Sequence, residues 1–387
     1  MPLFDVYPLF DVTPVRGQGV YVYDDQGQRY LDFYGGHAVI SIGHAHPQYV
    51  QRLSEQVQRL GFYSNSVHHP LQREVAQKLG KLSGCEDYQL FLCNSGAEAV
   101  ENALKMASFE TGKRKVIAFR HGFHGRTSAA VNVTDKPSIQ APINQTFPTE
   151  FHPLNEWSGV AESLSKGDVC AVIIEGIQGI GGVHVPDPSF LVELARLCKQ
   201  HGAVLILDEI QSGFGRSGRF FAYQYAPIEP DIITMAKGMG NGFPVGGVLL
   251  HPRFRAKHGM LGSTFGGNHL ACAAVLAVLD ILAAEDLLNN ARTQGDYLQS
   301  SLRNIHQVKA VRGRGLMIGL EMDHPVAELR KWLLYQEHTF TGSAADPNVL
   351  RLLPPLTITP PDIDAFLQSF THAMDTMYLD EAQKLTV

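Results

Sequence analysis

A lysine and an aspartate stand where two apolar runs of the chain end, and this position makes both of them candidates for chemistry. Asp208 closes the run at 203–207, and Lys237 follows the run at 232–236. A charge beside buried chain is costly unless it has a partner of opposite sign. Burial also lowers the pKa of an amine, which makes the amine nucleophilic near neutral pH. Each residue alone fits a helix cap or a structural salt bridge, but together they favour a shared ligand.

A third candidate is the segment Ser95, Gly96 and Ala97, which follows the apolar run at 89–93 and precedes a helical pattern. Ser95 followed by Glu98 is a capping box. The free backbone N–H groups of Gly96 and Ala97, at the positive end of a helix, also form a potential anion site. Taken alone, the motif fits a plain cap and an anion site about equally.

Residues 213–218 match the pattern G-x-G-x-x-G, which would indicate a nicotinamide dehydrogenase if it opened a helix. The residues that follow lead to Pro227 and Pro230 without a helical pattern. A lone match of this kind is a weak signal. We therefore discount it, although it defines the alternative from a different enzyme class.

The elements that must position these residues alternate along the chain. Continuous apolar runs, rather than alternating ones, are typical of strands buried on both faces of a parallel sheet. They lie at 89–93, 116–119, 169–175, 204–208, 232–236 and 247–250, with helical patterns between several of them. The pattern predicts an α/β fold with a large, doubly wound, mostly parallel sheet over residues 46–255. Ligands of such sheets bind at the carboxyl ends of the strands, where the three candidates stand.

The order of expected helices and strands changes after about residue 255. Helices are expected at 268–283 and on to about 303, and short strands at 308–311, 316–321 and 349–353. A last helix is expected after Thr359, which can cap it, with Ile363, Phe366, Leu367, Phe370 and Met374 on one face. Residues 256–387 thus predict a smaller α+β domain. The N-terminal segment, 1–45, with strands at 20–24 and 29–33, is expected to pack beside it.

Composition limits the function classes. The 387 residues carry a net charge of −6 and no long basic run, so we expect no nucleic-acid or membrane partner. The longest apolar stretch, 271–284, is too short to cross a bilayer and predicts a core helix. The N-terminus has no signal-peptide pattern. The five cysteines lack metal-ligand spacing and are typical of reduced thiols, which favours a cytoplasmic protein without a metal.

Five short motifs in order give the chain its resemblance to a known family. They are residues 94–99 (Asn-Ser-Gly-Ala-Glu-Ala), 123–127 (Phe-His-Gly-Arg-Thr), 207–213 (Leu-Asp-Glu-Ile-Gln-Ser-Gly), 236–238 (Ala-Lys-Gly) and 263–268 (Ser-Thr-Phe-Gly-Gly-Asn). The set resembles the class III aminotransferases, which depend on pyridoxal 5′-phosphate (PLP) and have fold type I. Within that family the likeness is greatest to the acylornithine aminotransferases. It extends from about residue 30 to about residue 356.

The resemblance implies a role for each candidate at the cofactor. Lys237 would bind the PLP aldehyde, and Asp208 would pair with the pyridine nitrogen so that the ring can accept electrons. Gly96 and Ala97 would bind the phosphate, and Phe123 would stack on the ring. The other residues that the resemblance assigns to the cofactor are Ser95, Glu209, Ile210, Gln211 and, toward the phosphate of a neighbouring subunit, Thr264. A homodimer with shared active sites is thereby implied.

The resemblance also implies the reaction. Arg126 would clamp a substrate carboxylate, Ser263 would lie near the substrate, and Arg351 would bind the α-carboxylate of 2-oxoglutarate or glutamate. The expected activity is transfer of the δ-amino group of an N²-acylornithine (acetyl or succinyl) to 2-oxoglutarate, in arginine metabolism. Ornithine or 4-aminobutyrate as donor is the alternative. An aminomutase fits Arg351 less well, and a catalytically silent relative fits the retained Lys237 and Asp208 poorly.

Two positions depart from the family pattern. Ile180 stands where the family has a glutamate that neutralises the arginine corresponding to Arg351. We therefore expect Arg351 to remain an open anion site that favours glutamate, 2-oxoglutarate or a substrate with a further carboxylate. His37 stands where related enzymes have a tyrosine or an apolar residue. It would contact an acyl group or be an ordinary hydrogen-bonded histidine, and the second interpretation is slightly favoured.

Overall fold

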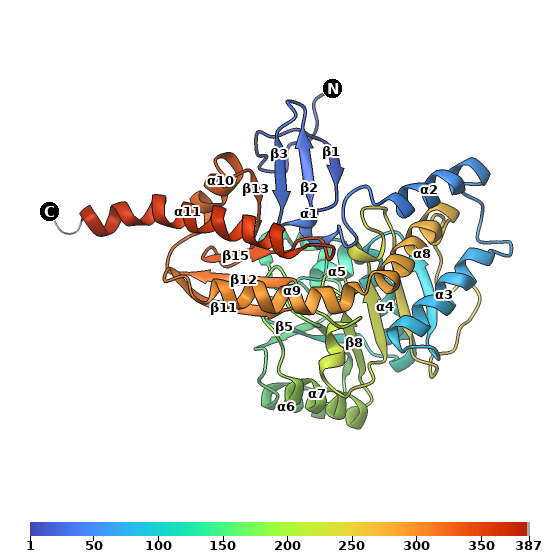
Figure 1. Cartoon of the computed structure of the whole chain (residues 1–387). Coiled ribbons are helices and arrows are strands. Elements are labelled where there is room, and N and C mark those ends of the chain that lie inside the picture. The colour runs from blue at the N-terminus through green and yellow to red at the C-terminus, as the bar shows by residue number, and fades with distance from the viewer. Residues whose placement is uncertain (385–387) are drawn as a thin grey trace.

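The centre of the fold is a seven-stranded sheet, seen in the computed structural model, which describes residues 1–384 (Figure 1). The sheet comprises β4 (Gln89–Cys93), β5 (Lys115–Phe119), β6 (Thr149–His152), β7 (Val169–Glu175), β8 (Val204–Asp208), β9 (Ile232–Met235) and β10 (Gly246–Leu250). The strand order is β4-β10-β9-β8-β7-β5-β6. β10 runs antiparallel to both neighbours, and the other neighbouring pairs are parallel. The predicted mostly parallel sheet is confirmed.

The six strands expected from apolar runs all lie in this sheet. β5, β7, β8, β9 and β10 are almost wholly buried, as strands covered on both faces must be. β6 was not expected, because its residues are half-buried at the edge of the sheet and lack an apolar run. The antiparallel direction of β10 was not foreseen either, since an apolar run carries no information on strand direction.

Helices cover the sheet. They include α2 (Pro47–Arg59), α3 (Pro70–Ser83), α4 (Gly96–Thr111), α5 (Ser128–Asn132), α6 (Ser158–Ser165), α7 (Pro188–His201) and α8 (His269–Ala284). α8 is buried on nearly all sides, which confirms the core helix expected at 271–284. Its one acidic residue, Asp280, pairs with Arg52 of α2 and Lys78 of α3, so the charge lies at the edge of the packed face. Within residues 1–384 no helix is long and apolar enough to cross a membrane.

Two smaller sheets join distant parts of the chain. One contains β1 (Pro14–Gln18), β2 (Tyr21–Asp24), β3 (Arg29–Asp32) and β13 (Thr339–Phe340). The other contains β11 (Val308–Arg314), β12 (Met317–Met322), β15 (Val349–Leu352) and β14 (Gly342–Ser343). Because β13 and β14 are consecutive, the chain passes from one small sheet directly into the other. The predicted N-terminal strands therefore lie beside the C-terminal region in Figure 1. α1 (Gly35–Ala38) follows β3.

The remaining helices are α9 (Leu287–Leu302), α10 (Ala327–Tyr335) and α11 (Pro360–Lys384). The face predicted for α11 is buried except for Leu367, which is half-buried. Phe366 stacks on Phe33 with ring centroids 4.1 Å apart. The cap of α11 differs from the expectation. The Asp362 carboxylate accepts from both the backbone and the hydroxyl of Thr359, so Asp362 rather than Thr359 supplies the acceptor.

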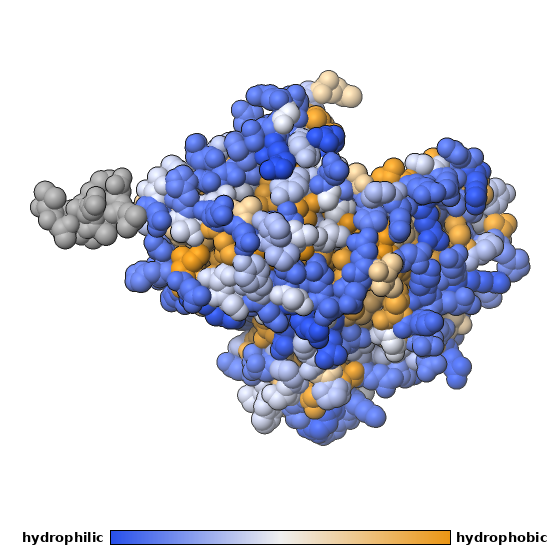
Figure 2. Space-filling model, in the orientation of Figure 1, coloured by the Kyte–Doolittle hydropathy of each residue, from blue (hydrophilic) through white to orange (hydrophobic). Residues whose placement is uncertain are grey.

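The division into residues 1–45, 46–255 and 256–387 remains a prediction. α8 lies within the last range, yet it packs against α2 and α3 of the middle range. Figure 2 shows a mainly hydrophilic surface on this face, with apolar groups scattered between polar ones. Several of those apolar groups lie over the region of α2 and α8.

Candidate active site

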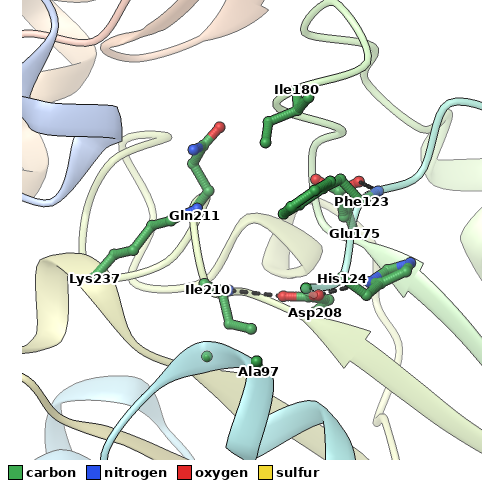
Figure 3. Close-up of a pocket in the computed structure, with 11 residues that line it drawn as sticks. Ala97, Phe123, His124, Glu175, Ile180, Asp208, Ile210, Gln211 and Lys237 are labelled. Carbon is green, nitrogen blue, oxygen red and sulfur yellow. Dashed lines mark hydrogen bonds and ion pairs between the residues drawn. The ribbon is translucent and has the colours of Figure 1, made fainter. Parts of the chain in front are cut away.

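A pocket lies at the carboxyl ends of β7, β8 and β9, at the position expected for a ligand of a parallel sheet (Figure 3). It takes residues from four loops and from the start of α4. The residues that line it are Gly96, Ala97, Phe123, His124, Gly125, Glu175, Ile180, Asp208, Ile210, Gln211 and Lys237. The lysine, the aspartate and the helix start that the sequence singled out are thus brought together.

Asp208 is paired with a buried histidine. Its Oδ2 lies 2.6 Å from Nδ1 of His124, and its Oδ1 accepts a hydrogen bond of 3.1 Å from the backbone of Ile210. Burial disfavours protonation of His124, but the hydrogen bond and charge of Asp208, with the charge of Glu175, outweigh it and raise the His124 pKa. An imidazolium against the carboxylate satisfies the charge that the sequence placed at this strand end.

Glu175 is a second acid at the same sheet edge, opposite Asp208 in the register of β7 and β8. One carboxylate oxygen accepts from the backbone of Phe123 and the other from the backbone of Gly179, each at 2.9 Å. Burial raises the pKa of Glu175 to about 7, and the charge of Asp208 adds to the effect. Glu175 therefore fixes two loops of the pocket to each other.

Lys237 begins the short 3₁₀ turn Lys237–Met239, where β9 has ended. Its backbone φ is +49°, in the left-handed region that non-glycine residues seldom adopt. Burial lowers the pKa of Lys237 to about 8, although the charges of Asp208 and Glu175 oppose the shift. In Figure 3 its side chain extends toward Gln211 along one side of the pocket. A neutral, nucleophilic amine is therefore accessible at moderate pH.

The start of α4 forms the floor of the pocket. Ser95 Oγ accepts from the backbone of Glu98 at 3.2 Å, as a cap does. The Glu98 carboxylate accepts instead from the backbone of Asn94, so the capping box is shifted by one residue. Within residues 1–384 the amides of Gly96 and Ala97 bond to no protein acceptor. A Cβ on Gly96 would lie 3.0 Å from the Ile210 side chain, so the close approach of the two loops favours glycine.

Arg351, on β15, reaches the other end of the pocket through Gln211. It is 2% exposed, and desolvation lowers its pKa to about 10. Its Nη1 donates to Oε1 of Gln211 at 3.2 Å, and its Nε donates to the carbonyl of Ser343 at 2.5 Å. Gln211 also donates from Nε2 to the carbonyl of His37 at 3.2 Å. This amide therefore connects the pocket to the guanidinium.

Six expected site residues do not line this pocket. Ser95 caps α4 beside it, and Arg351 reaches it only through Gln211. The other four lie farther from it. Glu209 points away from it, and its carboxylate accepts from Ser212, Ala222 and Tyr223 at 2.7–2.9 Å. The role at the cofactor that the resemblance implies for its side chain is not supported, because successive residues at a strand end face opposite sides. Arg126 is exposed, one residue beyond Gly125. Ser263 and Thr264 line a separate hollow with Asn65.

His37 has a partner that the sequence could not show. The Tyr34 hydroxyl lies 2.6 Å from Nδ1 and 2.7 Å from Nε2 of its ring. Desolvation, together with the charges of Arg351 and Lys237, lowers the pKa of His37 to about 4. These contacts favour a neutral, hydrogen-bonded histidine.

His124 and Glu175 are the site residues that sequence reasoning missed. His124 stands inside the motif at 123–127, but a histidine between a phenylalanine and a glycine gives no sign of its partner. Glu175 ends a seven-residue buried strand, as Asp208 ends its own. The rule that drew attention to Asp208 and Lys237 would have identified Glu175 as well.

The donor set of the pocket fits PLP. The free amides of Gly96 and Ala97 suit a phosphate, and the Asp208 carboxylate, fixed by His124, suits a protonated ring nitrogen. Lys237 supplies an amine of lowered pKa for an aldehyde. The Phe123 ring stands on the far side of the pocket from Lys237 in Figure 3, where it can cover a planar group.

Comparison with known proteins places the chain in a family. Residues 5–374 match the family described as aminotransferase class-III. An acetylornithine aminotransferase of Bacillus subtilis is 42% identical, over 96% of this chain and 97% of that protein. One of Methanosarcina mazei is 39% identical, over 92% of this chain and 90% of that protein.

Solved structures agree. An ornithine aminotransferase of Toxoplasma gondii superimposes with a TM-score of 0.89 at 29% identity, covering 96% of this chain and 93% of that one. An N-acetylornithine aminotransferase of Stenotrophomonas maltophilia gives a TM-score of 0.82 at 33% identity, covering 97% and 98%. The chain therefore belongs to the class-III aminotransferase family, and it is a PLP-dependent aminotransferase.

Proposed function

We propose that this enzyme transfers the δ-amino group of an N²-acylornithine to 2-oxoglutarate, giving the acylated glutamate semialdehyde and glutamate. The observation that carries the proposal is the set of relatives named acetylornithine aminotransferase, at 38–42% identity over at least 92% of this chain. The buried Arg351 supports the acceptor, because a guanidinium in a desolvated site recognises a carboxylate.

The chemistry divides between cofactor and protein. When bound, PLP accepts the electron pair left on the substrate carbon after that carbon loses a proton. The Asp208 carboxylate, held by His124, would stabilise positive charge at the ring nitrogen. The start of α4 would hold the phosphate, and Phe123 would cover the ring. These residues would orient the substrate relative to Lys237.

Lys237 moves the proton. With cofactor and donor bound, the free Lys237 amine would take the proton from the donor's δ-carbon as a general base. The lowered pKa of about 8 keeps a useful share of this amine neutral at moderate pH. In the second half-reaction the same amine would deliver a proton to the α-carbon derived from 2-oxoglutarate, and glutamate would be released.

Other ω-amines are the second candidate. The good superposition with an ornithine aminotransferase favours ornithine as the alternative donor. 4-Aminobutyrate would use the same chemistry. The pocket does not distinguish these donors by itself, because Arg126 and Thr264 lie outside it.

A donor panel tests the proposal. Acetylornithine, succinylornithine, ornithine and 4-aminobutyrate are compared with 2-oxoglutarate as kcat/KM. We expect an acylornithine to exceed unacylated ornithine by at least ~10-fold, the discrimination that one well-recognised group provides. A higher kcat/KM for ornithine or 4-aminobutyrate would replace the proposal with that activity.

We also propose a homodimer with shared active sites in the cytoplasm. Thr264 and Phe265 are exposed, and the Phe265 ring lies 5.4 Å from the exposed ring of Phe62. Such paired apolar rings on the surface suit a protein interface. All five cysteines are buried and unpaired, which suits a reducing compartment. Sedimentation of the wild type tests the dimer, and a monomer at micromolar concentration would exclude it.

A further inference from the structure

Arg351 is a buried cation whose protein partners are neutral. Within residues 1–384, its hydrogen bonds go to the Gln211 amide oxygen and to the Ser343 carbonyl, and its Nη2 makes none. No carboxylate lies within ion-pair distance of it among the same residues. A buried guanidinium without a counter-ion is costly, and a carboxylate that enters the site relieves that cost.

The acids of the pocket are not free to supply this counter-ion. Glu175 is near enough for its charge to act on Arg351, but its two oxygens are bound to the backbone amides of Phe123 and Gly179. Asp208 is bound to His124 and to the backbone of Ile210. To pair with Arg351, either acid would have to give up two hydrogen bonds in a desolvated site.

Ile180 and Gln211 keep this end of the pocket neutral. The carbonyl of Ile180 accepts from the backbone of Ala345 at 2.7 Å, which places Ile180 beside the segment whose Ser343 holds Arg351. In Figure 3 the Ile180 side chain points into the pocket. Gln211 is oriented by its bond to His37, and a Cβ on Gly179 would lie 1.8 Å from its Oε1. Gly179 thus leaves room for the amide that faces Arg351.

We propose that Arg351 is an open carboxylate site in both half-reactions, with Ile180 and Gln211 as the residues that keep it open. A five-carbon dicarboxylate then also binds, unproductively, to the form of the enzyme that awaits the amino donor. In a ping-pong cycle the two substrates should meet alternate enzyme forms. An acceptor that occupies the wrong form competes with the donor, so 2-oxoglutarate inhibits at high concentration. The inference rests on the proposed function only for the identity of the acceptor.

Calorimetry with glutarate is the direct test. Glutarate has the two carboxylates of 2-oxoglutarate but no oxo group to react. We expect wild-type holoenzyme, in the form that awaits the donor, to bind glutarate. Ile180→Glu should weaken that binding by about tenfold or more, because its carboxylate pairs with Arg351. The matched control is Ile180→Gln. Glutamine equals glutamate in size but carries no charge, so this variant should bind glutarate as the wild type does.

Steady-state rates give the second test. With a fixed donor concentration and rising 2-oxoglutarate, the rate should pass through a maximum for wild type and Ile180→Gln. Ile180→Glu should show simple saturation. Circular dichroism and cofactor absorbance show whether Ile180→Glu folds. If it does not, Gln211→Glu replaces it in both tests, because this variant places a carboxylate beside the same guanidinium from another loop.

Two results would overturn the inference: no glutarate binding to the wild type, or equal binding to Ile180→Glu and Ile180→Gln. Neither depends on the donor. An enzyme that binds glutarate but prefers ornithine contradicts the proposed function alone. An acylornithine enzyme that does not bind glutarate in the donor-awaiting form contradicts this inference alone.

Discussion

The two ends of the active-site pocket treat a buried charge in opposite ways. At one end the Asp208 carboxylate has a cationic partner, His124, 2.6 Å away. At the other end the Arg351 guanidinium has only carbonyl partners among residues 1–384. A charge that the protein itself neutralises can hold a permanently bound cofactor in one orientation. A charge that the protein leaves unpaired attracts substrates that bind and dissociate in each cycle.

The largest effect should come from removing Lys237, which stands between the two ends. Lys237→Gln keeps the length of the side chain but has no basic amine. We expect kcat to fall by about 10⁴, the upper range for a general base. Single-turnover kinetics with reconstituted enzyme measure it. Lys199→Gln, on the outer surface of α7, is the matched control, and a similar fall there would contradict a specific role.

At the paired end, Asp208→Asn removes the charge and keeps the shape. The ring nitrogen of the cofactor then loses its anionic partner, and kcat should fall by about 10²–10³ with little change in KM for 2-oxoglutarate. Asp231→Asn is the control, since Asp231 also caps a strand of the sheet, but through Leu205 and Arg253. Equal losses of activity in the two variants would mean that both result from lower stability of the protein, and not from a missing partner of the ring nitrogen.

At the open end, Arg351→Lys keeps the charge but loses the planar fork. KM for 2-oxoglutarate should rise about 30-fold, or ~2 kcal/mol, while kcat changes less. Initial rates over a range of 2-oxoglutarate measure the change. A fall in kcat with KM unaltered would show that Arg351 acts on the reaction centre and not on binding.

The pH dependence of cofactor capture isolates Lys237 from the substrates. Its pKa is lowered to about 8, so the neutral amine gains about tenfold per pH unit below that value and levels off above it. The rate constant for capture of PLP by cofactor-free protein should follow this curve in stopped-flow absorbance. Pyridoxine phosphate, which lacks the aldehyde, should show no such rise. A curve still rising at pH ~10 would indicate an unshifted lysine.

The smallest effect is expected at His37. His37→Asn tolerates the backbone φ of +69° and removes the ring that contacts Tyr34. Because Gln211 binds the backbone carbonyl of His37 and not its ring, kcat/KM should change less than about threefold. The donor panel of the proposed function measures this. A tenfold loss confined to acylated donors would instead assign His37 to the acyl group.

The sequence predicted the paired end of the pocket better than the open one. Asp208 and Lys237 were identified because a charge after an apolar run is conspicuous, and Ser95 to Ala97 because a cap has a local pattern. His124 was missed because its partner lies 84 positions away in the chain. The resemblance assigned Glu209 to the cofactor, whereas alternation turns its side chain to the opposite side.

At the open end, Ile180 was recognised as a departure from a family pattern. The Arg351 guanidinium has the neutral Gln211 amide as its partner instead of a carboxylate. This contact could not be predicted, because Arg351 and Gln211 lie on different elements and meet only through tertiary packing. The buried strands could be predicted from apolar runs, because a strand buried on both faces consists almost wholly of apolar residues. The direction of β10 could not be predicted, because an apolar run carries no information on direction. The edge strand β6 could not be predicted either, because its half-buried residues form no apolar run.

The left-handed backbone of Lys237 has a consequence for how this enzyme responds to selection. A non-glycine residue in that region costs about 1–2 kcal/mol, against a total stability of about 5–15 kcal/mol for a typical protein. Its buried amine adds a desolvation cost. A screen for heat resistance alone should therefore enrich asparagine or glycine at this position. These variants would be inactive, because they lack the catalytic amine. Thermostable variants of this protein have to be sought with the catalytic lysine held fixed.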